Sequence, residues 1–362
     1  MPTQPFCIDM PDDEVTELRR RLSTTRFPDV AENVDFTRGT SGEYLRRLVD
    51  YWAHEFDWSA QQASLNELPQ FTTTIQDVQL HFVHSPAEGQ HAGVILLLHG
   101  WPDSAFRYRH VVPLLNAAGW DVVVPSLPGF GFSGHRAKSS PETAALLDSL
   151  MVQILGYDRY VVAGGDVGTL VGLALGRDHA DHVAGLFLTN ADYPKGNEQN
   201  LTASEQEYLG YIGQWYQREG AYAAVQSTKP QIVGPALNDS PAGLAAWMLG
   251  LIDTGAAAHD VEAAFGGRDE LLTNFSLYWF TQTAASAADT YAADPWGPPP
   301  VRVEVPTGFA IFPREAQSPR EWCERQARVV RYTRMPRGGH FAALEVPADF
   351  AAELVAFAAD LT

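Results

Sequence analysis

The sequence predicts an α/β fold in which a mostly parallel sheet carries helices on both faces. Three observations lead to this prediction. Strand-like apolar runs alternate with helix-like segments from residue 86 to residue 190. One of these runs, 94–98, is apolar at every position, which is typical of a strand buried on both faces. Another, 160–163, breaks into a glycine-rich turn and resumes at once as an apolar helix.

The other elements follow in order along the chain. Acidic or N-capping residues open two amphipathic helices, which are expected at 12–22 and 41–56. An alternating pattern downstream of them predicts paired strands at 71–84. In the alternating part, the expected strands are 94–98, 121–124, 160–163 and 184–188, and the expected helices are 106–117, 141–154 and 168–175. Two more strands and a closing helix are expected at 305–312, 329–333 and 348–361.

These elements divide the chain into an N-terminal region, 1–85, and a core that is interrupted by an insertion. The first half of the core is 86–190. Residues 191–299 lose the strand rhythm and become helical, aromatic and alanine-rich, which predicts a helical cap. The stretch Gly297-Pro298-Pro299-Pro300 marks the end of the cap, and the second half of the core, 300–362, follows.

Asp166 lies at the tip of the glycine-rich turn, in Gly164-Gly165-Asp166-Val167-Gly168. Most strand–turn–helix elbows of this shape carry serine as a nucleophile. A serine that opened an epoxide or displaced a halide would leave a stable ether, whereas an aspartate leaves an ester that water can hydrolyse. The carboxylate therefore indicates alkyl-transfer hydrolysis. The same glycine pattern also suits an ordinary turn, so the motif alone leaves both interpretations open.

A second turn, His99-Gly100-Trp101-Pro102, follows the strand expected at 94–98. The backbone N–H groups of Trp101 and Val167 are placed to stabilise an oxyanion when an ester on Asp166 is attacked. The alternative is a simple strand-to-helix turn stabilised by glycine and proline.

His340 is the candidate base, because it lies in a glycine turn near the carboxyl terminus and completes the chain order nucleophile, acid, histidine. The acid is expected after the strand at 305–312. Glu315 is the candidate that would accept the imidazole N–H and fix its tautomer, with Glu304 and Glu321 as rivals.

With these motifs in this order, the chain resembles the microsomal-type epoxide hydrolases, which are α/β-hydrolases with an N-terminal extension. The resemblance covers nearly all 362 residues. It rests on ordered blocks that include Asp57-Trp58, Pro69-Gln70-Phe71, His99-Gly100-Trp101-Pro102, Gly164-Gly165-Asp166, Gln226-Ser227-Thr228-Lys229-Pro230, Leu277-Tyr278-Trp279 and Gly338-Gly339-His340-Phe341.

The resemblance implies an α/β-hydrolase fold with a helical cap and an N-terminal meander that wraps the core and covers the lid. It also implies that Glu315 is the charge-relay acid and that two lid tyrosines, Tyr222 and Tyr291, donate hydrogen bonds to the epoxide oxygen. Ring opening needs such donors because it generates an alkoxide, and a phenol with a pKa of about 10 stays protonated at neutral pH.

Pocket residues are predicted less directly: we expect His99, Pro102, Phe130 and Trp279 to line the substrate pocket. The loop at 125–134, which carries Phe130, is equally well explained as a turn. At Val167 the chain departs from the family, which commonly has tryptophan there. The smaller side chain suggests room for a different or bulkier substrate.

Composition predicts a cytoplasmic, soluble protein. The chain starts Met1-Pro2-Thr3-Gln4-Pro5 without the apolar anchor of membrane-bound relatives, and no window approaches the roughly 18 apolar residues of a spanning helix. Two cysteines cannot form a disulfide framework. The formal charge of −19 disfavours nucleic-acid partners and weakly favours a neutral or apolar substrate. Neither a metal-ligand spacing nor a phosphate loop is present, so no cofactor or metal is expected.

The predicted activity is therefore hydrolysis of a small-molecule epoxide to a diol through an ester on Asp166. The alternatives are a haloalkane or haloacid dehalogenase, which Val167 disfavours, and a non-catalytic ligand-binding hydrolase fold. The natural substrate, its stereochemistry, the biological pathway and a homo-oligomeric state stay open at this level.

Overall fold

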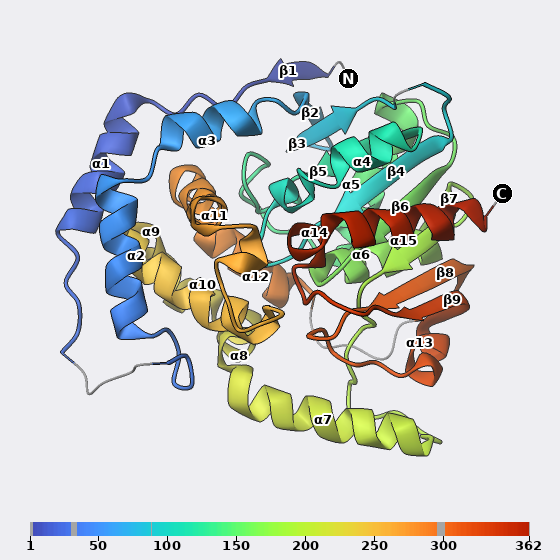
Figure 1. Cartoon of the computed structure of the whole chain (residues 1–362). Helices are drawn as coiled ribbons and strands as arrows, with labels where there is room; N and C mark the ends of the chain where they lie inside the picture. Colours follow the sequence, from blue (N-terminus) through green and yellow to red (C-terminus); the bar gives the residue numbers. More distant parts are fainter. Residues whose placement is uncertain (1–2, 30–34, 88, 295–300, 362) are drawn as a thin grey trace.

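The computed structural model describes residues 3–29, 35–87, 89–294 and 301–361. Within them the strands form a nine-stranded sheet of order β1-β2-β3-β5-β4-β6-β7-β8-β9 (Figure 1). The strands β1 to β3 and the pair β3–β5 are antiparallel, and the remaining neighbours are parallel. The mostly parallel sheet is thus confirmed. The strands are β1 Gln4–Phe6, β2 Gln70–Ile75, β3 Val78–Ser85, β4 Gly93–Leu98, β5 Trp120–Pro125, β6 Tyr160–Gly164, β7 Val183–Leu188, β8 Val303–Ile311 and β9 Ala327–Arg334.

Helices flank the sheet and fill the segments before and between its strands. They are α1 Asp12–Ser23, α2 Gly42–His54, α3 Trp58–Leu65, α4 Val112–Ala117, α5 Ser140–Ser149, α6 Val167–Asp178, α7 Ala203–Glu219, α8 Ala221–Thr228, α9 Gly234–Asp239, α10 Pro241–Gly255, α11 Arg268–Thr281, α12 Ala284–Ala293, α13 Arg320–Gln326, α14 Ala342–Glu345 and α15 Pro347–Ala359. None of the helices in the described residues is both long enough and apolar enough to cross a membrane.

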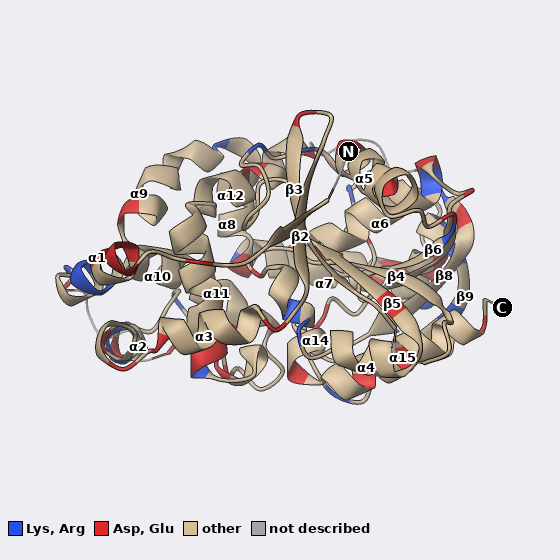
Figure 2. Cartoon of the chain, turned by 90° about the horizontal axis from the view of Figure 1, so that it is seen from above, with Lys and Arg blue, Asp and Glu red and all other residues tan. Residues whose placement is uncertain are grey.

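The central strand β4 shows why the sheet has helices on both faces. Successive side chains of a strand point to opposite faces. Leu96 and Leu98 join the apolar cluster that includes α5 and α6, whereas Ile95 and Leu97 join the cluster of α4 and α15. Figure 2 shows α4 and α15 on one side of the sheet and α5 and α6 on the other. Both faces of β4 are therefore buried against helices, which explains why every position of this strand is apolar.

Two predicted helices differ in detail from the observed ones. The segment predicted as one helix at 106–117 is a 3₁₀ turn, Ala105–Tyr108, followed by α4. Pro113 lies in the first turn of α4, where its missing N–H costs nothing, but it could not continue a helix from the preceding turn. The helix predicted at 141–154 ends as α5 at Ser149 and continues as a π-helical turn, Leu150–Ile154. Sequence patterns also missed β1, α3, α13 and α14, which are too short to show a period.

The segment predicted as a cap forms α7 to α12 between β7 and β8. In Figure 1 the helices α1 and α2 lie along the outer side of this helical layer. The buried Trp52 indole N–H donates to Ser276 Oγ of α11 at 3.0 Å, and Arg21 pairs with Asp239 at 2.7 Å. The exact domain boundaries stay a prediction, and the expected cap exit at 297–300 lies outside the described residues.

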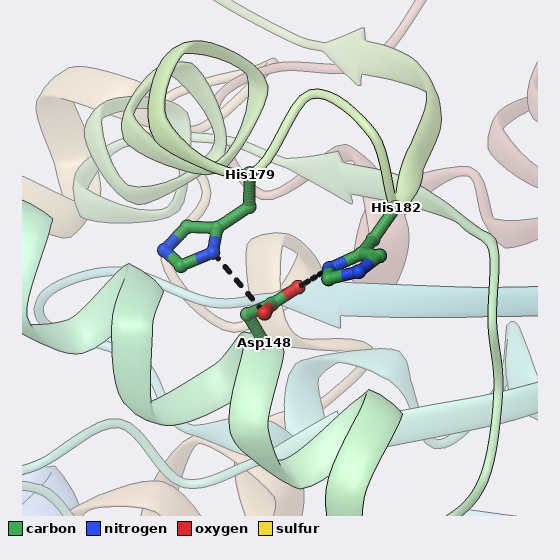
Figure 3. Close-up of side chains that lie close together, drawn as sticks. All are labelled: Asp148, His179 and His182. Atoms are coloured by element: carbon green, nitrogen blue, oxygen red, sulfur yellow. Dashed lines mark hydrogen bonds and ion pairs between the residues drawn. The ribbon is translucent and has the colours of Figure 1, made fainter.

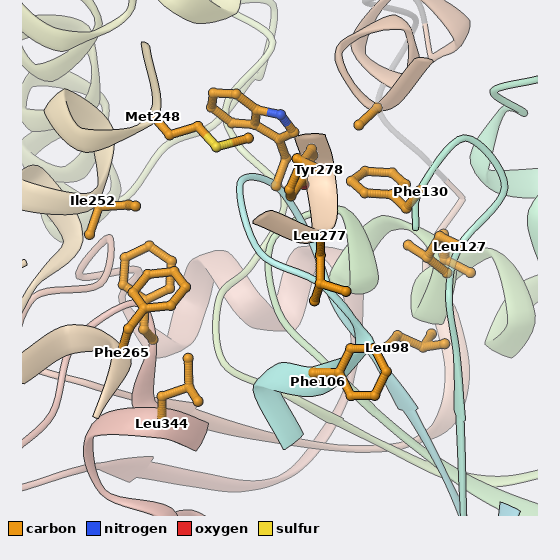
Figure 4. Close-up of a cluster of buried hydrophobic side chains, with 14 of the residues drawn as sticks. Leu98, Phe106, Leu127, Phe130, Met248, Ile252, Phe265, Leu277, Tyr278 and Leu344 are labelled. Atoms are coloured by element: carbon orange, nitrogen blue, oxygen red, sulfur yellow. The ribbon is translucent and has the colours of Figure 1, made fainter. Parts of the chain in front are cut away.

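An apolar cluster joins the cap to the core (Figure 4). Leu98 at the end of β4 and Phe130 of the loop after β5 belong to this cluster, together with Ile252 of α10 and Tyr278 of α11. All four are buried. Because burial of such side chains stabilises packing by about 1.5–3 kcal/mol each, the cluster fixes the cap over the carboxyl ends of the parallel strands.

Candidate active site

The predicted site residues of the core all follow the carboxyl ends of parallel strands. Trp101 follows β4, Asp166 follows β6, Glu315 follows β8 and His340 follows β9. The carboxyl ends of parallel strands meet at one edge of the sheet, where α/β proteins bind their ligands. The fold therefore brings together residues that are up to 239 positions apart, from 101 to 340.

Asp166 lies on a tight turn between β6 and α6. Its backbone has φ 56° and ψ −126°, a conformation that non-glycine residues rarely adopt. The turn approaches β4 so closely that a Cβ on Gly168 would lie 2.4 Å from the Leu98 carbonyl oxygen. The Asp166 N–H donates to Asn190 Oδ1 at 2.8 Å, which helps to hold the turn. Sequence patterns missed Asn190, although the polar pair Thr189-Asn190 directly after β7 was a usable signal.

Two backbone N–H groups reach the Asp166 carboxylate, and they are the two predicted for the oxyanion. Trp101 N–H donates to Asp166 Oδ1 at 2.9 Å, and Val167 N–H also bonds to this carboxylate. Gly100 must be glycine here, because a Cβ would lie 2.3 Å from Asp166 Oδ1. The Trp101–Pro102 peptide bond is cis.

His340 lies between the two carboxylates. Its Nδ1 is 2.7 Å from Glu315 Oε2, and its Nε2 is 3.8 Å from Asp166 Oδ2, too far for a hydrogen bond. Glu315 is buried, and its other oxygen accepts the N–H of Ala316 at 2.7 Å. The rivals lie elsewhere: Glu304 is exposed and pairs with Arg302, and Glu321 is exposed.

The charges of this group shift its pKa values. Burial alone would lower the pKa of His340, but the charge and hydrogen bond of Glu315, with the charge of Asp166, raise it to about 9. Burial raises the pKa of Asp166 above its usual range, while the His340 charge and the N–H groups of Trp101 and Val167 oppose that shift. The Asp166 carboxylate therefore faces a His340 ring whose protonated form is favoured.

A buried ion pair that sequence patterns missed supports two of these loops. Arg107 is 3% exposed and pairs with Asp103, which is 1% exposed. Arg107 Nη2 donates to the His340 carbonyl oxygen at 2.9 Å, and Asp103 Oδ1 accepts the Gly100 N–H at 3.0 Å. The pair therefore links the loop after β4 to the histidine loop. An acid and an arginine four residues apart, directly after the His99-Gly100-Trp101-Pro102 turn, were the available signal.

Tyr222 of α8 and Tyr291 of α12 reach the site from the cap. Their hydroxyl groups hydrogen bond to each other, and burial raises the pKa of both phenols well above the ordinary value. The Tyr222 ring stacks on Trp101 with ring centroids 5.4 Å apart, and the Tyr291 ring meets Trp101 edge-on. Both phenols are therefore protonated at neutral pH and lie beside the oxyanion loop.

Two cavities open on Asp166, and Tyr193 and Tyr222 line both of them. One cavity passes His340 and encloses about 520 Å³, open solvent included. The other passes Val167 and Tyr291 and encloses about 860 Å³ on the same measure. Tyr193 was not identified from the sequence, where nothing distinguishes it from other tyrosines.

The four residues predicted to line the pocket are not among the residues that line these two cavities, and their role in the pocket stays a prediction. His99 is fully buried, accepts the Leu127 N–H at 3.0 Å through Nε2 and packs edge-on against Phe130. The Pro102 carbonyl accepts a hydrogen bond from Asn274, and the Arg21 guanidinium lies over the Trp279 ring. These contacts hold the cap and the loops on the core.

A sheet of this strand order, with an elbow after β6 and a helical insertion after β7, is the architecture of the α/β hydrolases. The family model described as alpha/beta hydrolase fold matches residues 93–234, and the one described as Epoxide hydrolase N terminus matches residues 3–108. The chain belongs to the epoxide hydrolase family, because curated members match it over nearly its whole length.

Several of these relatives are at least 30% identical to the chain. A putative epoxide hydrolase of Stigmatella aurantiaca is 36% identical over 97% of this chain and 83% of the relative. Epoxide hydrolase 1 of Oryctolagus cuniculus is 33% identical over 98% of this chain and 88% of the relative. Among solved structures, the Aspergillus niger epoxide hydrolase aligns with a TM-score of 0.89 and 29% identity, covering 100% of this chain and 97% of that one. The roles of individual residues stay predictions.

Proposed function

We propose that this enzyme converts an epoxide and water to a vicinal diol through a hydroxyalkyl ester on Asp166. The observation that supports it best is the position of the Asp166 carboxylate. It is held by two backbone N–H groups, faces His340 at 3.8 Å without a hydrogen bond to it, and opens on two cavities. Such a carboxylate is oriented but still free to attack.

In the first stage Asp166 Oδ2 attacks a ring carbon in line with the breaking C–O bond. Oδ1 is engaged by the Trp101 N–H, so it becomes the carbonyl oxygen of the ester. The ring oxygen takes a proton from Tyr222 or Tyr291 as its bond to carbon breaks. Because both phenols are protonated at rest, they can donate to the developing alkoxide without a prior proton transfer.

In the second stage His340 removes a proton from water, and the hydroxide attacks the ester carbonyl carbon. Trp101 and Val167 N–H groups donate to the tetrahedral oxyanion. The bond between that carbon and the alkyl oxygen then breaks, and the leaving alkoxide takes the proton of the new carboxyl O–H. The diol leaves, Asp166 is again a carboxylate, and the proton on His340 returns to the tyrosine. Glu315 keeps Nε2 of His340 available for this step, because it binds Nδ1 at 2.7 Å.

The two stages also couple through charge. The negative charge of Asp166 is one of the causes that raise the pKa of His340 to about 9. Ester formation removes this charge, so the pKa of His340 falls when the ester is present. The imidazole therefore becomes a more available base at neutral pH at the moment when water must be activated.

The substrate class follows from the cavity walls. Val167, Leu170 and Ala223 line the larger cavity beside aromatic tyrosines, and Asp192, Lys195 and Asp294 line another part of it. The apolar and aromatic part supports a neutral or apolar epoxide. The small side chain of Val167 also lines this cavity. It leaves room beside Asp166 for a bulky substituent of the epoxide.

A single turnover in ¹⁸O-labelled water, with enzyme in excess over styrene oxide, tests the ester. The first diol should carry no label, and the peptide that contains Asp166 should gain ¹⁸O, because water attacks the carboxylate carbon. The same experiment with Asp166→Asn should give no diol in freshly prepared protein.

A labelled diol from the first turnover would mean direct attack of water and would overturn the role of Asp166. Release of bromide from a bromoalkane without epoxide turnover would instead indicate a dehalogenase. Wild-type enzyme in unlabelled water is the mass reference for both the diol and the peptide.

A further inference from the structure

A cluster of potential metal ligands lies at the opposite end of α6 from Asp166. Asp148 comes from α5, His179 is the C-cap residue directly after α6, and His182 lies in the turn before β7. Figure 3 shows both imidazole rings turned toward the Asp148 carboxylate from its two sides. Nothing in the proposed epoxide chemistry uses these residues.

The donor atoms of the cluster already lie at coordination spacing. His182 Nδ1 is 2.8 Å from Asp148 Oδ1, His179 Nδ1 is 3.1 Å from Asp148 Oδ2, and all three ligand atoms lie within 4.8 Å of one another. Ligands about 2.0–2.1 Å from a tetrahedral zinc ion are about 3.3 Å apart. Small rotations of the side chains would therefore admit an ion between them.

Backbone and neighbouring groups hold the three ligands in place. The His182 N–H donates to the His179 carbonyl at 3.0 Å, and the His182 carbonyl accepts the Tyr160 N–H at 2.9 Å. The Tyr160 hydroxyl donates to Asp148 Oδ1 at 2.8 Å. Hydrogen bonds of this kind orient metal-binding side chains and raise affinity.

The surroundings favour a cation and leave a path for it. His179 is at the carboxyl end of a twelve-residue helix, where the helix dipole is negative. The Asp148 side chain is 10% exposed, whereas those of His179 and His182 are 23% and 37% exposed. The carboxylate is thus largely shielded from water, and the imidazole rings face the solvent.

We propose that Asp148, His179 and His182 form a site for a divalent transition metal, with zinc as the preferred ion. Two imidazole nitrogens and one carboxylate oxygen suit Zn²⁺, and water would complete a tetrahedral shell. Both Nδ1 atoms donate to the Asp148 carboxylate, at 2.8 and 3.1 Å. Binding needs the lone pair on each Nδ1, so on metal binding the proton of each neutral ring moves to Nε2 by exchange with water, and a ring that holds two protons releases one.

The role of this site is structural. Twelve residues of helix separate it from Asp166, which corresponds to about 18 Å. A bound ion would tie α5 to the turn between α6 and β7, and so it would fix the far end of the helix that begins at the nucleophile.

Zinc titration of the untagged, chelator-treated full chain by calorimetry tests the proposal. We expect saturable binding of one ion per chain, visible d–d absorption with Co²⁺ in place of Zn²⁺, and a higher melting temperature with Zn²⁺. Substitutions of residues that only support the ligands typically weaken metal binding by about 10- to 100-fold. The double variant His179→Gln/His182→Gln removes two ligands, so it should weaken zinc binding by more than this.

His91→Gln is the matched control, because His91 lies 3.1 Å from Asp121 but belongs to no cluster of three potential metal ligands in the described part of the chain. It should bind zinc like the wild type. Absence of saturable binding to the wild type, or equal binding by wild type and double variant, would overturn the proposal. The Co²⁺ spectrum of the wild type decides the question even if the double variant does not fold.

Discussion

His340 faces two opposite requirements at the level of a single residue. The charges of Glu315 and Asp166 favour its protonated form and raise its pKa to about 9, yet ester hydrolysis needs the neutral ring. The proposed ester resolves the conflict by removing the charge of Asp166. In the free enzyme, the same charges stabilise the folded state, because an unfolded histidine with a pKa of 6.5 lacks them.

The stability of the free enzyme should therefore depend on pH through His340. Because its folded pKa is raised, its contribution is fully present below about pH 6.5 and is lost as the pH rises through about 9. The free energy of unfolding should fall over this range by about 3 kcal/mol at most. Urea unfolding between pH 6 and 10 measures this, and His340→Gln should remove that part of the slope. Equal slopes in both proteins would contradict the prediction.

Glu315 should matter for the second stage far more than for the first. With Glu315→Gln the amide no longer provides the charge that favours the correct imidazole tautomer, so we expect ester hydrolysis to slow by about 100-fold or more. The ester should then accumulate and appear in intact-protein mass spectra as an added mass equal to the substrate. Glu304→Gln, an exposed rival carboxylate, should behave like the wild type.

Residue identities were predictable where chain order constrains them. The order of elements along the chain predicts an acid after β8 and a histidine after β9. In the structure Glu315 lies beside His340, whereas Glu304 pairs with Arg302. No local pattern tells which side of a turn faces a cavity, so the four expected pocket residues stay a prediction. The side chain of His99 points into the packing below the loop, although its neighbour Trp101 directs a backbone N–H at Asp166.

At the level of elements, the elbow depends on how closely α6 approaches β4. Gly168→Ala would put a Cβ 2.4 Å from the Leu98 carbonyl oxygen, which is backbone and cannot move easily. We expect a loss of about 1–3 kcal/mol in unfolding free energy and lower activity, since any shift of the turn displaces Asp166 and Val167.

Gly213→Ala is the matched control for this change, because nothing lies within 4 Å of a Cβ at that position of α7. In a helix interior it should be neutral or stabilise by about 0.5–1 kcal/mol. Urea unfolding and initial rates on styrene oxide measure both variants. A fully stable and active Gly168→Ala protein would show that the turn tolerates more than its spacing implies.

Long periodic elements were predictable, and their interruptions were not. The strands around β4 follow from continuous apolar runs because both of their faces are buried. The apolar pattern of 106–117 is helical throughout, and only Pro113 indicates that the helix is interrupted between the 3₁₀ turn and α4. The three-residue strand β1 forms only because β2, more than sixty residues later, provides its partner.

At the level of the whole molecule, the N-terminal region, the cap and the core form one packed body. Trp52 and Ser276 are 224 positions apart, yet their side chains share a buried hydrogen bond. No local pattern contains such a contact, so sequence alone predicts the parts of this chain and not the way they meet. The cluster of Figure 4 extends the same packing from the cap helices to the end of β4.

This packing predicts that the N-terminal region and the cap do not unfold separately from the active site. Trp52 is 1% exposed and packs against Phe275 of α11, with ring centroids 6.1 Å apart. Trp52→Ala should therefore lower the free energy of unfolding by about 3–5 kcal/mol. Trp52→Phe keeps most of the apolar contact and loses only the hydrogen bond to Ser276, so we expect a loss of about 1–3 kcal/mol in the free energy of unfolding.

In urea, the loss of activity and the loss of far-UV circular dichroism should shift together in both variants. If activity were lost at a lower urea concentration while the dichroism midpoint stayed unchanged, the cap would be an independent unit, and the contact between Trp52 and α11 would stabilise the lid alone.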